Sequence, residues 1–315
     1  MAVFTRVSES AIARHLERYG LPAPDIVNGI AEGTENTNYK LLVAGKRYIL
    51  TLFEGRTAES DLPYFLALMD HVASKGLPAP RPIPTLDGAV LTELAERPAA
   101  LISFLPGRPN MDPGANDAAR AGATLARFHA AARDFPRTRP NTMGPKSWHE
   151  MAEEAGAALD RFGEGAREDV DGALRLIEAA WPRRLPQGTV HADLFPDNLL
   201  LDHGTPSGII DFYFACTDFL AYDLAVSMNA YGPEAGDVDE TNADALLGGY
   251  QSVRPLEPAE KQSLRLLLLG SALRFFLTRA VDNIFAPESA LYTPKPPSPW
   301  LRLMRHHLRA LEGTT

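Results

Sequence analysis

The stretch from His191 to Asn198, which reads His-Ala-Asp-Leu-Phe-Pro-Asp-Asn, constrains the fold of this 315-residue chain more than any other feature. A short strand leads into it, and the apolar residues 199–201 leave it as another strand. Residues 202–204 then turn the chain into a third strand, which ends at Asp211. The pattern predicts a polar loop held between short strands, with a further acidic residue at the end of the neighbouring strand.

The spacing of the polar residues in this loop points to phosphoryl transfer. An Asp two residues after His191, and an Asn five residues after that Asp, match the catalytic loop of kinases. We expect Asp193 to orient an acceptor hydroxyl and take its proton, while His191 braces the loop. Asn198 and Asp211 are the expected ligands of the Mg²⁺ that accompanies ATP, since Mg²⁺ prefers oxygen donors. The alternative is a chance match in an ordinary strand-turn-strand segment, and the flanking strands argue against it.

Composition and charge limit the class of protein. The hydrophobic fraction of 45% is that of a globular protein, and a net charge of −9 disfavours nucleic acid or an anionic membrane as a partner. The most apolar run, residues 266–269, is far too short to span a bilayer. The single cysteine, Cys216, excludes an internal disulfide and suits a reducing compartment, so we expect a cytoplasmic protein.

The order of predicted elements indicates two lobes. Residues 1–103 are expected to form a strand-rich N-terminal lobe, and residues 104–315 a larger, mainly helical C-terminal lobe that holds the polar loop. In the first lobe we expect helices at residues 8–19 and 61–74, the latter capped by Ser60, and strands at 38–43, 47–53, 90–93 and 99–104, with a turn at 96–98. In the second we expect helices at 117–132, 148–162, 168–180, 220–231, 243–250, 259–282 and 299–312. This is an α+β arrangement of the bilobal protein-kinase-like type.

These features carry a family resemblance over nearly the whole chain. The chain resembles the aminoglycoside phosphotransferase-like kinases and, within them, the homoserine kinases. The segments on which the resemblance rests are residues 33–39, 48–54, 62–66, 104–107, 191–198, 210–212, 222–225 and 274–279. The resemblance implies the transfer of a phosphoryl group from ATP to L-homoserine, which gives O-phospho-L-homoserine on the route to threonine.

The resemblance also implies where the nucleotide binds. A loop between the first two strands covers its phosphates, backbone groups near the lobe boundary hold adenine, and a lysine on the third strand usually contacts the phosphates. The corresponding residues here are Thr34, Asn36 and Asn38 in the loop, Ser103 and Leu105 at the boundary, and Thr51 at the lysine position. A threonine brings no charge, so Lys40, Arg47 or Arg56 would have to compensate.

Several polar residues are candidates for the acceptor site. Arg274 and Arg279 lie on an otherwise apolar helix, and either one could clamp the carboxylate of homoserine; the alternative is an ion pair with Asp282 or a helix end. The ammonium of homoserine needs an acid or carbonyl groups, and Asp193, Asp218 or Asp223 could serve. Asp223 also resembles the buried acid that anchors the catalytic loop in the family, although an acid near a helix N-terminus also needs no special role. Tyr213 and Asn229 are possible contacts at the rim of the site.

Other functions remain open at this stage. The same enzyme class acts on other alcohols, including choline, ethanolamine, methylthioribose and aminoglycosides, although an arginine in the acceptor pocket disfavours cationic acceptors. A non-catalytic nucleotide-binding pseudokinase is the second class, and only Thr51 supports it.

Overall fold

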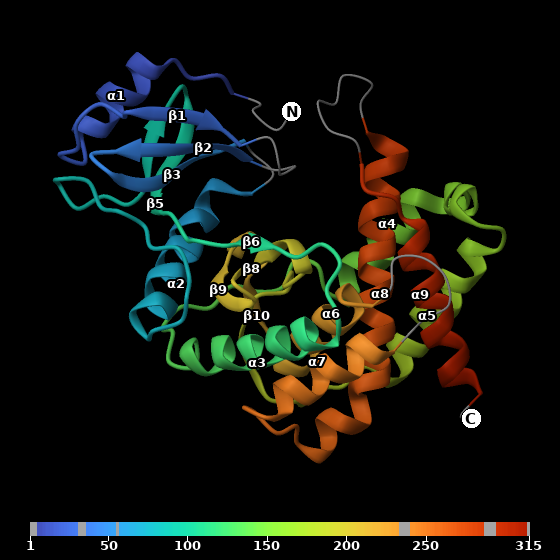
Figure 1. The fold of residues 1–315 in the computed structure, drawn as a ribbon. Helices are drawn as coiled ribbons and strands as arrows, with labels where there is room; N and C mark the ends of the chain where they lie inside the picture. Colours follow the sequence, from blue (N-terminus) through green and yellow to red (C-terminus); the bar gives the residue numbers. More distant parts are fainter. Residues whose placement is uncertain (1–4, 31–35, 55–56, 233–239, 287–293, 314–315) are drawn as a thin grey trace. The chain divides into compact units, whose positions relative to one another are not determined.

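The computed structural model describes residues 5–30, 36–54, 57–232, 240–286 and 294–313, and it divides into two compact units. The first unit ends at Arg108 and takes in residues 200–203 and 207–213 from later in the chain. The second unit contains most of the remaining chain, from Pro109 onward. Figure 1 shows strands concentrated in the first unit and helices in the second, as the sequence predicts.

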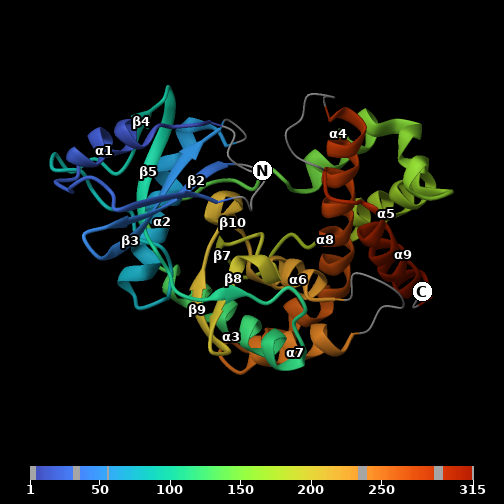
Figure 2. The ribbon, with the colours of Figure 1, turned by 45° about the horizontal axis from the view of Figure 1, so that its top comes forward.

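The first unit is built on a five-stranded antiparallel sheet with the strand order β1-β2-β3-β5-β4. Alternate residues of β2 are buried, as expected for a strand with one face against a core. Helix α1 covers that face, because Ile12 and Leu16 pack with Leu41 and Leu50 of the sheet, and Figure 2 shows α1 lying along it. The elements are α1 (Glu9–Glu17), β1 (Ile26–Gly29), β2 (Asn36–Val43), β3 (Lys46–Phe53), η1 (Glu59–Asp61), α2 (Leu62–Ser74), β4 (Thr92–Leu94) and β5 (Arg97–Ser103).

Three local predictions for this unit need correction. Helix α2 begins at Leu62, after a 3-10 turn, and its N-cap is Asp61 without a side-chain hydrogen bond, so Ser60 is not the cap. The turn between β4 and β5 lies at Ala95 and Glu96, both with positive φ, one residue earlier than expected. The pairing of β5 with β3 ends at Ala99, one residue after Pro98. Pro98 can therefore be part of β5, because no residue of β3 needs a hydrogen bond from its backbone nitrogen.

A small three-stranded sheet, in the order β6-β8-β9, packs against the segment that follows β5. Its strands are β6 (Arg108–Pro109), β8 (Leu199–Asp202) and β9 (Thr205–Ile209). The Ser207 hydroxyl donates to the carbonyl of Pro106 at 2.7 Å, and Gly107 has a φ of 103° with no room for a side chain beside Leu201. The segment that leads to Asp211 is therefore fixed to the end of the first lobe.

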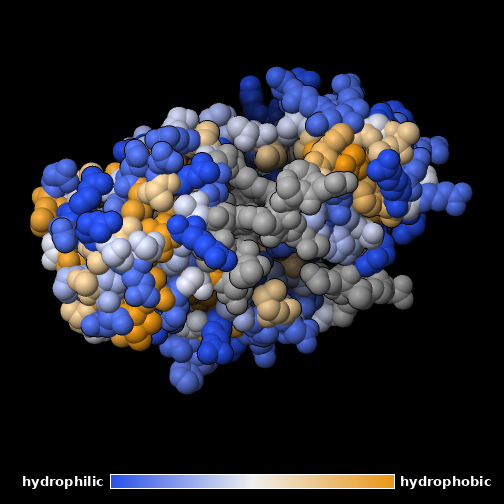
Figure 3. Space-filling view, turned by 90° about the horizontal axis from the view of Figure 1, so that it is seen from above, coloured by the Kyte–Doolittle hydropathy of each residue, from blue (hydrophilic) through white to orange (hydrophobic). Residues whose placement is uncertain are grey.

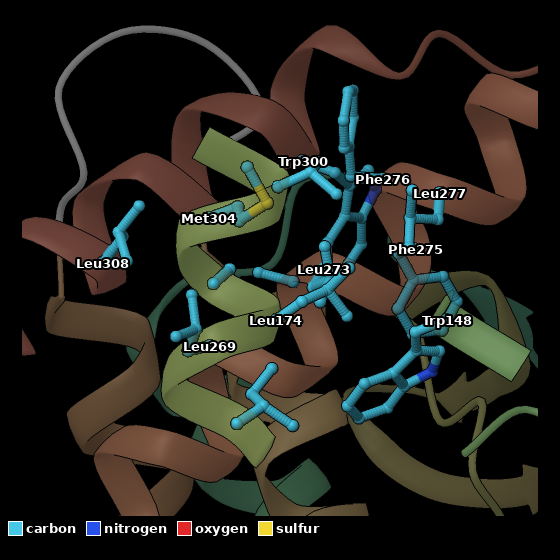
Figure 4. Packing of buried hydrophobic residues seen from close by; sticks show 14 of the residues in the cluster. Trp148, Leu174, Leu269, Leu273, Phe275, Phe276, Leu277, Trp300, Met304 and Leu308 are labelled. Carbon is cyan, nitrogen blue, oxygen red and sulfur yellow. The ribbon is translucent and has the colours of Figure 1, made fainter. Parts of the chain in front are cut away.

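The second unit is a helical bundle around the long helix α8. This helix packs against α4, α5, α6 and α9, and its apolar side chains form one core with Trp148, Leu174, Trp300 and Met304 (Figure 4). The elements are α3 (Ala115–Ala131), α4 (Pro145–Ala155), η2 (Gly156–Phe162), α5 (Ala166–Ala180), β7 (Gln187–Val190), η3 (Pro196–Asn198), β10 (Cys216–Phe219), α6 (Leu220–Ala230), α7 (Thr241–Gln251), α8 (Pro258–Phe285) and α9 (Ser298–Glu312). The 3-10 turn η4 (Phe212–Phe214) has its first two residues in the first unit. The expected helix 148–162 ends early, because Gly156 adopts a φ of 52° and the chain continues as a 3-10 segment.

Helices α3 and α7 cross at unusually close range. A Cβ atom built on Gly249 would overlap the carbonyl oxygen of Ala119, and one built on Gly122 would overlap that of Leu246. Only glycine lets two helix backbones approach this closely. The close approach also brings side chains from the later parts of α3 and α7 into contact.

The surface carries both hydrophilic and hydrophobic side chains, as expected from the composition of the chain. On the face drawn in Figure 3, hydrophilic side chains are interrupted by separate hydrophobic areas. Among the residues that the structure describes, no helix is both long and apolar enough to cross a lipid bilayer.

Candidate active site

The loop between β7 and β8 carries two of the three residues expected at the phosphoryl-transfer site. The side-chain amide of Asn198 donates to the backbone carbonyl of Asp193 at 2.8 Å and to its carboxylate at 3.1 Å. These contacts use the nitrogen of the Asn198 amide and leave its oxygen for another partner. The structure therefore brings Asp193 and Asn198 together, in a loop whose last residues form the 3-10 turn η3.

The start of this loop is held by Asp223 on α6. The backbone nitrogens of His191 and Ala192 donate to the two carboxylate oxygens of Asp223, at 2.8 and 2.7 Å. Both Asp223 and His191 are fully buried. This geometry is that of a loop anchor, whereas a helix-terminal acid with no special role would face solvent.

The charge of Asp223 is stabilised despite its burial. Burial alone would raise the pKa of this carboxyl, but the hydrogen bond from His129 and the charges of His129 and His191 outweigh it and hold the pKa below its ordinary value. Asp223 therefore accepts hydrogen bonds as a carboxylate.

A chain of buried hydrogen bonds continues from Asp223 through α3 and α7. His129 contacts Asp223 through Nε2 and the hydroxyl of Tyr250 through Nδ1, both at 2.8 Å. Arg254 donates to the same hydroxyl at 3.2 Å and to both carboxylate oxygens of Glu260 at 3.0 and 3.1 Å.

Glu260 in turn completes a capping box at the first turn of α8 with Glu257. The network therefore links the catalytic loop to the start of α8. The sequence alone does not predict this network; its one signal is a histidine, His129, on the buried side of an amphipathic helix.

A neighbour of the expected base and one expected metal ligand have strained backbones. Ala192, which precedes Asp193, has a φ of 63°, and Asp211 has a φ of 65°. Positive φ is unfavourable for residues other than glycine, and such strain concentrates at functional sites. Arg274 of α8 contacts the first of these positions, because its guanidinium donates to the carbonyl of Ala192 at 2.7 Å.

Asp211, the third expected residue, belongs to the first unit, where it follows β9. The strand before it is fixed by a hydrogen bond from the backbone nitrogen of Ile209 to the carbonyl of Pro78, at 2.8 Å. After it, the ring of Tyr213 packs edge-on against Phe53 and Phe65, with ring centroids 5.4 and 5.8 Å apart. Tyr213, expected at the acceptor rim, thus has packing contacts within the first unit.

The expected nucleotide-binding residues lie in the first unit, except that Thr34 falls outside the described residues. Thr51 is buried and donates to the side-chain oxygen of Asn38 at 2.7 Å, across a register that pairs these two residues. Asn36, at the start of β2, is also buried. Thr51, which the resemblance places at the position of a strand lysine, is therefore hydrogen-bonded to another neutral side chain.

Of the two residues expected to hold adenine, Ser103 borders a cavity of about 420 Å³ and Leu105 does not. Ser103 pairs with Arg81 through the backbone, and the side chain of Leu105 lies against Gly208 of β9. Lys40 and Arg47 both lie over the ring of Phe104, at 4.8 and 4.2 Å from its centre, so these two cations are placed at the boundary and not beside Thr51. The cavity is lined by Gly45, Lys46, Arg47, Tyr48, Ser103, Phe104 and Pro106.

Of the remaining acceptor candidates, Asn229 is buried within the helical bundle. Its amide nitrogen donates to the carbonyl of Leu268 at 2.9 Å and to the hydroxyl of Ser271 at 3.1 Å, and its oxygen contacts His307 at 2.9 Å. These contacts connect α6, α8 and α9. Arg279 is partly exposed and lies over the ring of Trp300, 5.3 Å from its centre.

Comparison with known proteins agrees with this arrangement. Residues 26–256 match the model of the phosphotransferase enzyme family. The chain is 47% identical to a homoserine kinase of Chelativorans sp. over 308 residues, which are 98% of this chain and 96% of that protein. It is 45% identical to a homoserine kinase of Methylobacterium nodulans over 314 residues, which are 99% of this chain and 98% of that protein.

Solved structures with low sequence identity share the fold. They include a spectinomycin phosphotransferase, with a TM-score of 0.71 at 14% identity and coverage of 98% of this chain and 99% of that one. An amicoumacin kinase gives a TM-score of 0.70 at 15% identity, with coverage of 98% and 94%. The protein-kinase-like α+β fold expected from the sequence is confirmed. On the strength of the matched family model and these full-length relatives, the chain belongs to the phosphotransferase enzyme family.

Proposed function

We propose that this protein transfers the γ-phosphoryl group of ATP to the hydroxyl of L-homoserine and so produces O-phospho-L-homoserine. The observation that carries the proposal is the identity of 45 to 47% with homoserine kinases along almost the whole chain. The phosphotransferase chemistry is supported by the loop from His191 to Asn198, in which the predicted base and metal ligand contact each other.

Asp193 is the proposed base. Its carboxylate is held by the amide of Asn198, and the backbone that leads to it is fixed by Asp223 and Arg274. A positioned carboxylate can orient the hydroxyl of the acceptor and accept its proton as the bond to phosphorus forms. His191 acts through the loop, because its backbone is bound to Asp223.

The residues present fit a magnesium ion that accompanies ATP. The amide nitrogen of Asn198 is used by Asp193, so the oxygen of the same amide is the group left to bind a cation. That oxygen and the carboxylate of Asp211 are hard donors of the type that Mg²⁺ prefers. When bound, the ion would neutralise charge on the transferred phosphoryl group.

The nucleotide is proposed to contact the first unit. Asn36, Asn38 and Thr51 would face the phosphates together with Thr34, while backbone groups of Ser103 and Leu105 would face adenine. Because Thr51 and Asn38 are bound to each other, we propose that this pair presents its remaining hydrogen-bonding groups in place of the usual lysine.

A panel of acceptors tests the proposed function. The purified protein is given ATP and Mg²⁺ with L-homoserine, choline, ethanolamine, methylthioribose or an aminoglycoside, and ADP release is followed while ³¹P NMR identifies the product. We expect turnover with L-homoserine and a phosphomonoester product. Faster turnover with any other alcohol would replace the proposed acceptor, and binding of ATP without turnover of any acceptor would indicate a pseudokinase.

A further inference from the structure

Arg274 and Arg279, which both lie on α8, have different surroundings. Arg274 is 2% exposed, and its guanidinium donates to the carbonyl of Ala192. The same group lies 4.5 Å from the ring centre of Phe275 and 5.5 Å from that of Phe214. Arg274 is therefore enclosed by aromatic rings and bound to the backbone of the catalytic loop, which are the surroundings of a positioning residue.

Arg279 lies farther along the same helix and beside a different part of the loop. Five residues of α-helix correspond to about 7.5 Å along the axis and about 140° around it. Its guanidinium lies over Trp300 and donates to the carbonyl of Pro296 at 3.2 Å, and the side chain is partly exposed. Unlike Arg274, it can be reached by a small molecule.

An aromatic cluster connects Arg279 with the catalytic loop. The ring of Trp300 is 5.7 Å from that of Phe195, and Phe275 lies 4.6 Å from Trp300 and 4.9 Å from Phe195. Phe195 is two residues after Asp193 in the sequence. The aromatic cluster that contacts Arg279 therefore includes Phe195, which closely follows the proposed base in the sequence.

A second cation lies beside the same loop. Lys295 contacts the carboxylate of Asp197 at 3.4 Å, and about half of the Lys295 side chain is exposed. Asp197 directly precedes the proposed metal ligand Asn198. Lys295 is therefore paired with an acid of the loop, whereas Arg279 places positive charge beside the aromatic cluster, where an anionic group of a substrate would be attracted.

We infer that Arg279, and not Arg274, binds the carboxylate of the amino-acid acceptor. The inference rests on the proposed function, because it assigns one end of a substrate whose other end is phosphorylated. Three carbon atoms separate the carboxylate carbon of homoserine from its hydroxyl oxygen, so the two ends need different residues of the site. The planar guanidinium can form two parallel hydrogen bonds with the carboxylate.

The test compares L-homoserine with 3-aminopropan-1-ol, which is homoserine without its carboxylate. For the wild-type protein and for Arg279→Ala and Arg279→Lys, kcat and KM are measured with both acceptors. We expect Arg279→Ala to raise the KM for L-homoserine by roughly 10- to 100-fold, as for loss of a charge-assisted pair. The ratio of kcat/KM between the two acceptors should fall by a similar factor, and Arg279→Lys should recover part of it.

Two further variants provide matched controls on α8. Arg274→Met should lower kcat for both acceptors alike and keep their ratio, because Arg274 acts on the loop backbone. Arg265→Ala, at an exposed position of the same helix, should keep both kcat and the ratio. Thermal unfolding and ATP binding of every variant confirm that it is folded.

The outcomes separate the two claims. If the wild-type protein does not phosphorylate L-homoserine, the proposed function is wrong. If it does, and Arg279→Ala keeps the wild-type ratio while Arg274→Met loses it, the assignment of Arg279 is overturned and Arg274 is the carboxylate ligand. If both variants keep the ratio, neither arginine binds the carboxylate and the inference is also overturned.

Discussion

The carboxylate of Asp223 accepts a hydrogen bond of 2.7 Å from the backbone nitrogen of Ala192, although 31 positions separate the two residues. Ala192 is held in a left-handed conformation, and Arg274 binds its carbonyl from α8. One peptide segment, directly before the proposed base, is therefore fixed at its nitrogen and at its oxygen by two buried and oppositely charged side chains.

Replacing Asp223 by Asn is expected to disrupt this segment. An amide has one oxygen to accept hydrogen bonds, whereas Asp223 uses two oxygens for three donors, so at least one backbone N–H or the ring of His129 loses its partner. Because a small displacement of a catalytic group has a large effect on rate, we expect kcat to fall by about 100-fold or more. Steady-state kinetics with a separate measurement of ATP binding checks this. An unchanged kcat would show that the anchor is not needed.

Replacing Asp193 by Asn should abolish turnover and leave nucleotide binding nearly intact. The amide has the size of the carboxylate but cannot take a proton from the acceptor hydroxyl. The contact with Asn198 only orients the side chain at position 193 and does not replace the lost base. Single-turnover measurements and titration with a fluorescent ATP analogue check the two parts separately. Asp211→Ala provides the comparison, because its loss of activity should be accompanied by loss of the dependence on Mg²⁺ concentration. Turnover by Asp193→Asn at the wild-type rate would exclude Asp193 as the base.

The crossing of α3 and α7 predicts opposite results for two neighbouring glycines. In Gly249→Ala the new methyl group would overlap the carbonyl oxygen of Ala119 and lie 2.7 Å from its carbon, so the helices must separate. We expect the free energy of unfolding to fall by about 1 to 3 kcal/mol, with a decrease in kcat because Tyr250 is displaced from His129. Gly248→Ala is the matched control: its Cβ meets no described atom within 4 Å, and it should stabilise the helix by up to ~1 kcal/mol. Urea unfolding of both variants provides the measurement, and equal effects would contradict the close approach.

The environment of His307 predicts a loss of stability in mild acid. Burial of the ring, followed by the charge of His306, lowers the pKa of His307 to about 3. Below about pH 6.5 the unfolded chain binds a proton at His307, while the folded protein does not. The contribution of this ring to the free energy of unfolding is therefore fully present above about pH 6.5 and is lost as the pH falls. Between pH 7 and pH 5 we expect the free energy of unfolding to decrease by about 2 kcal/mol from this group.

The variant His307→Gln tests this assignment, because glutamine can still donate to Asn229 but does not titrate. Urea unfolding of the wild type and the variant at both pH values gives the difference. If the two proteins lose stability in parallel, His307 is not the titrating group.

The sequence predicted the parts of the site that are local. Asp193 and Asn198 are five positions apart, and their spacing predicted that both belong to one polar loop, in which the structure shows a contact between them. The strands β2 and β3 and the helix α3 were visible from their apolar periodicity. Strand β1 was not, since it is an edge strand that is largely exposed and has no buried face to produce an alternation.

Contacts between distant segments could not be predicted in this way. His129 meets Asp223 and Tyr250 across 94 and 121 positions, and periodicity shows that each residue faces a core without showing which residues meet there. The same limit applies to Arg274 and Arg279 of α8. Both were expected to need a partner on an apolar helix, but only the packing of the helix shows that Arg274 reaches Ala192 and Arg279 reaches Trp300.

Residues 200–203 and 207–213 belong to the first unit, and this limits where the chain can be cut to obtain a folded fragment. A fragment that stops at Arg108 would contain the sheet, α1 and α2 but would lack the strands β8 and β9. The carbonyl of Pro106 would lose its donor Ser207, and Leu105 would lose its contact with Gly208. Truncation at that point therefore yields an incomplete folding unit, and recombinant work on nucleotide binding needs the full-length polypeptide or a permuted design that restores the two missing strands.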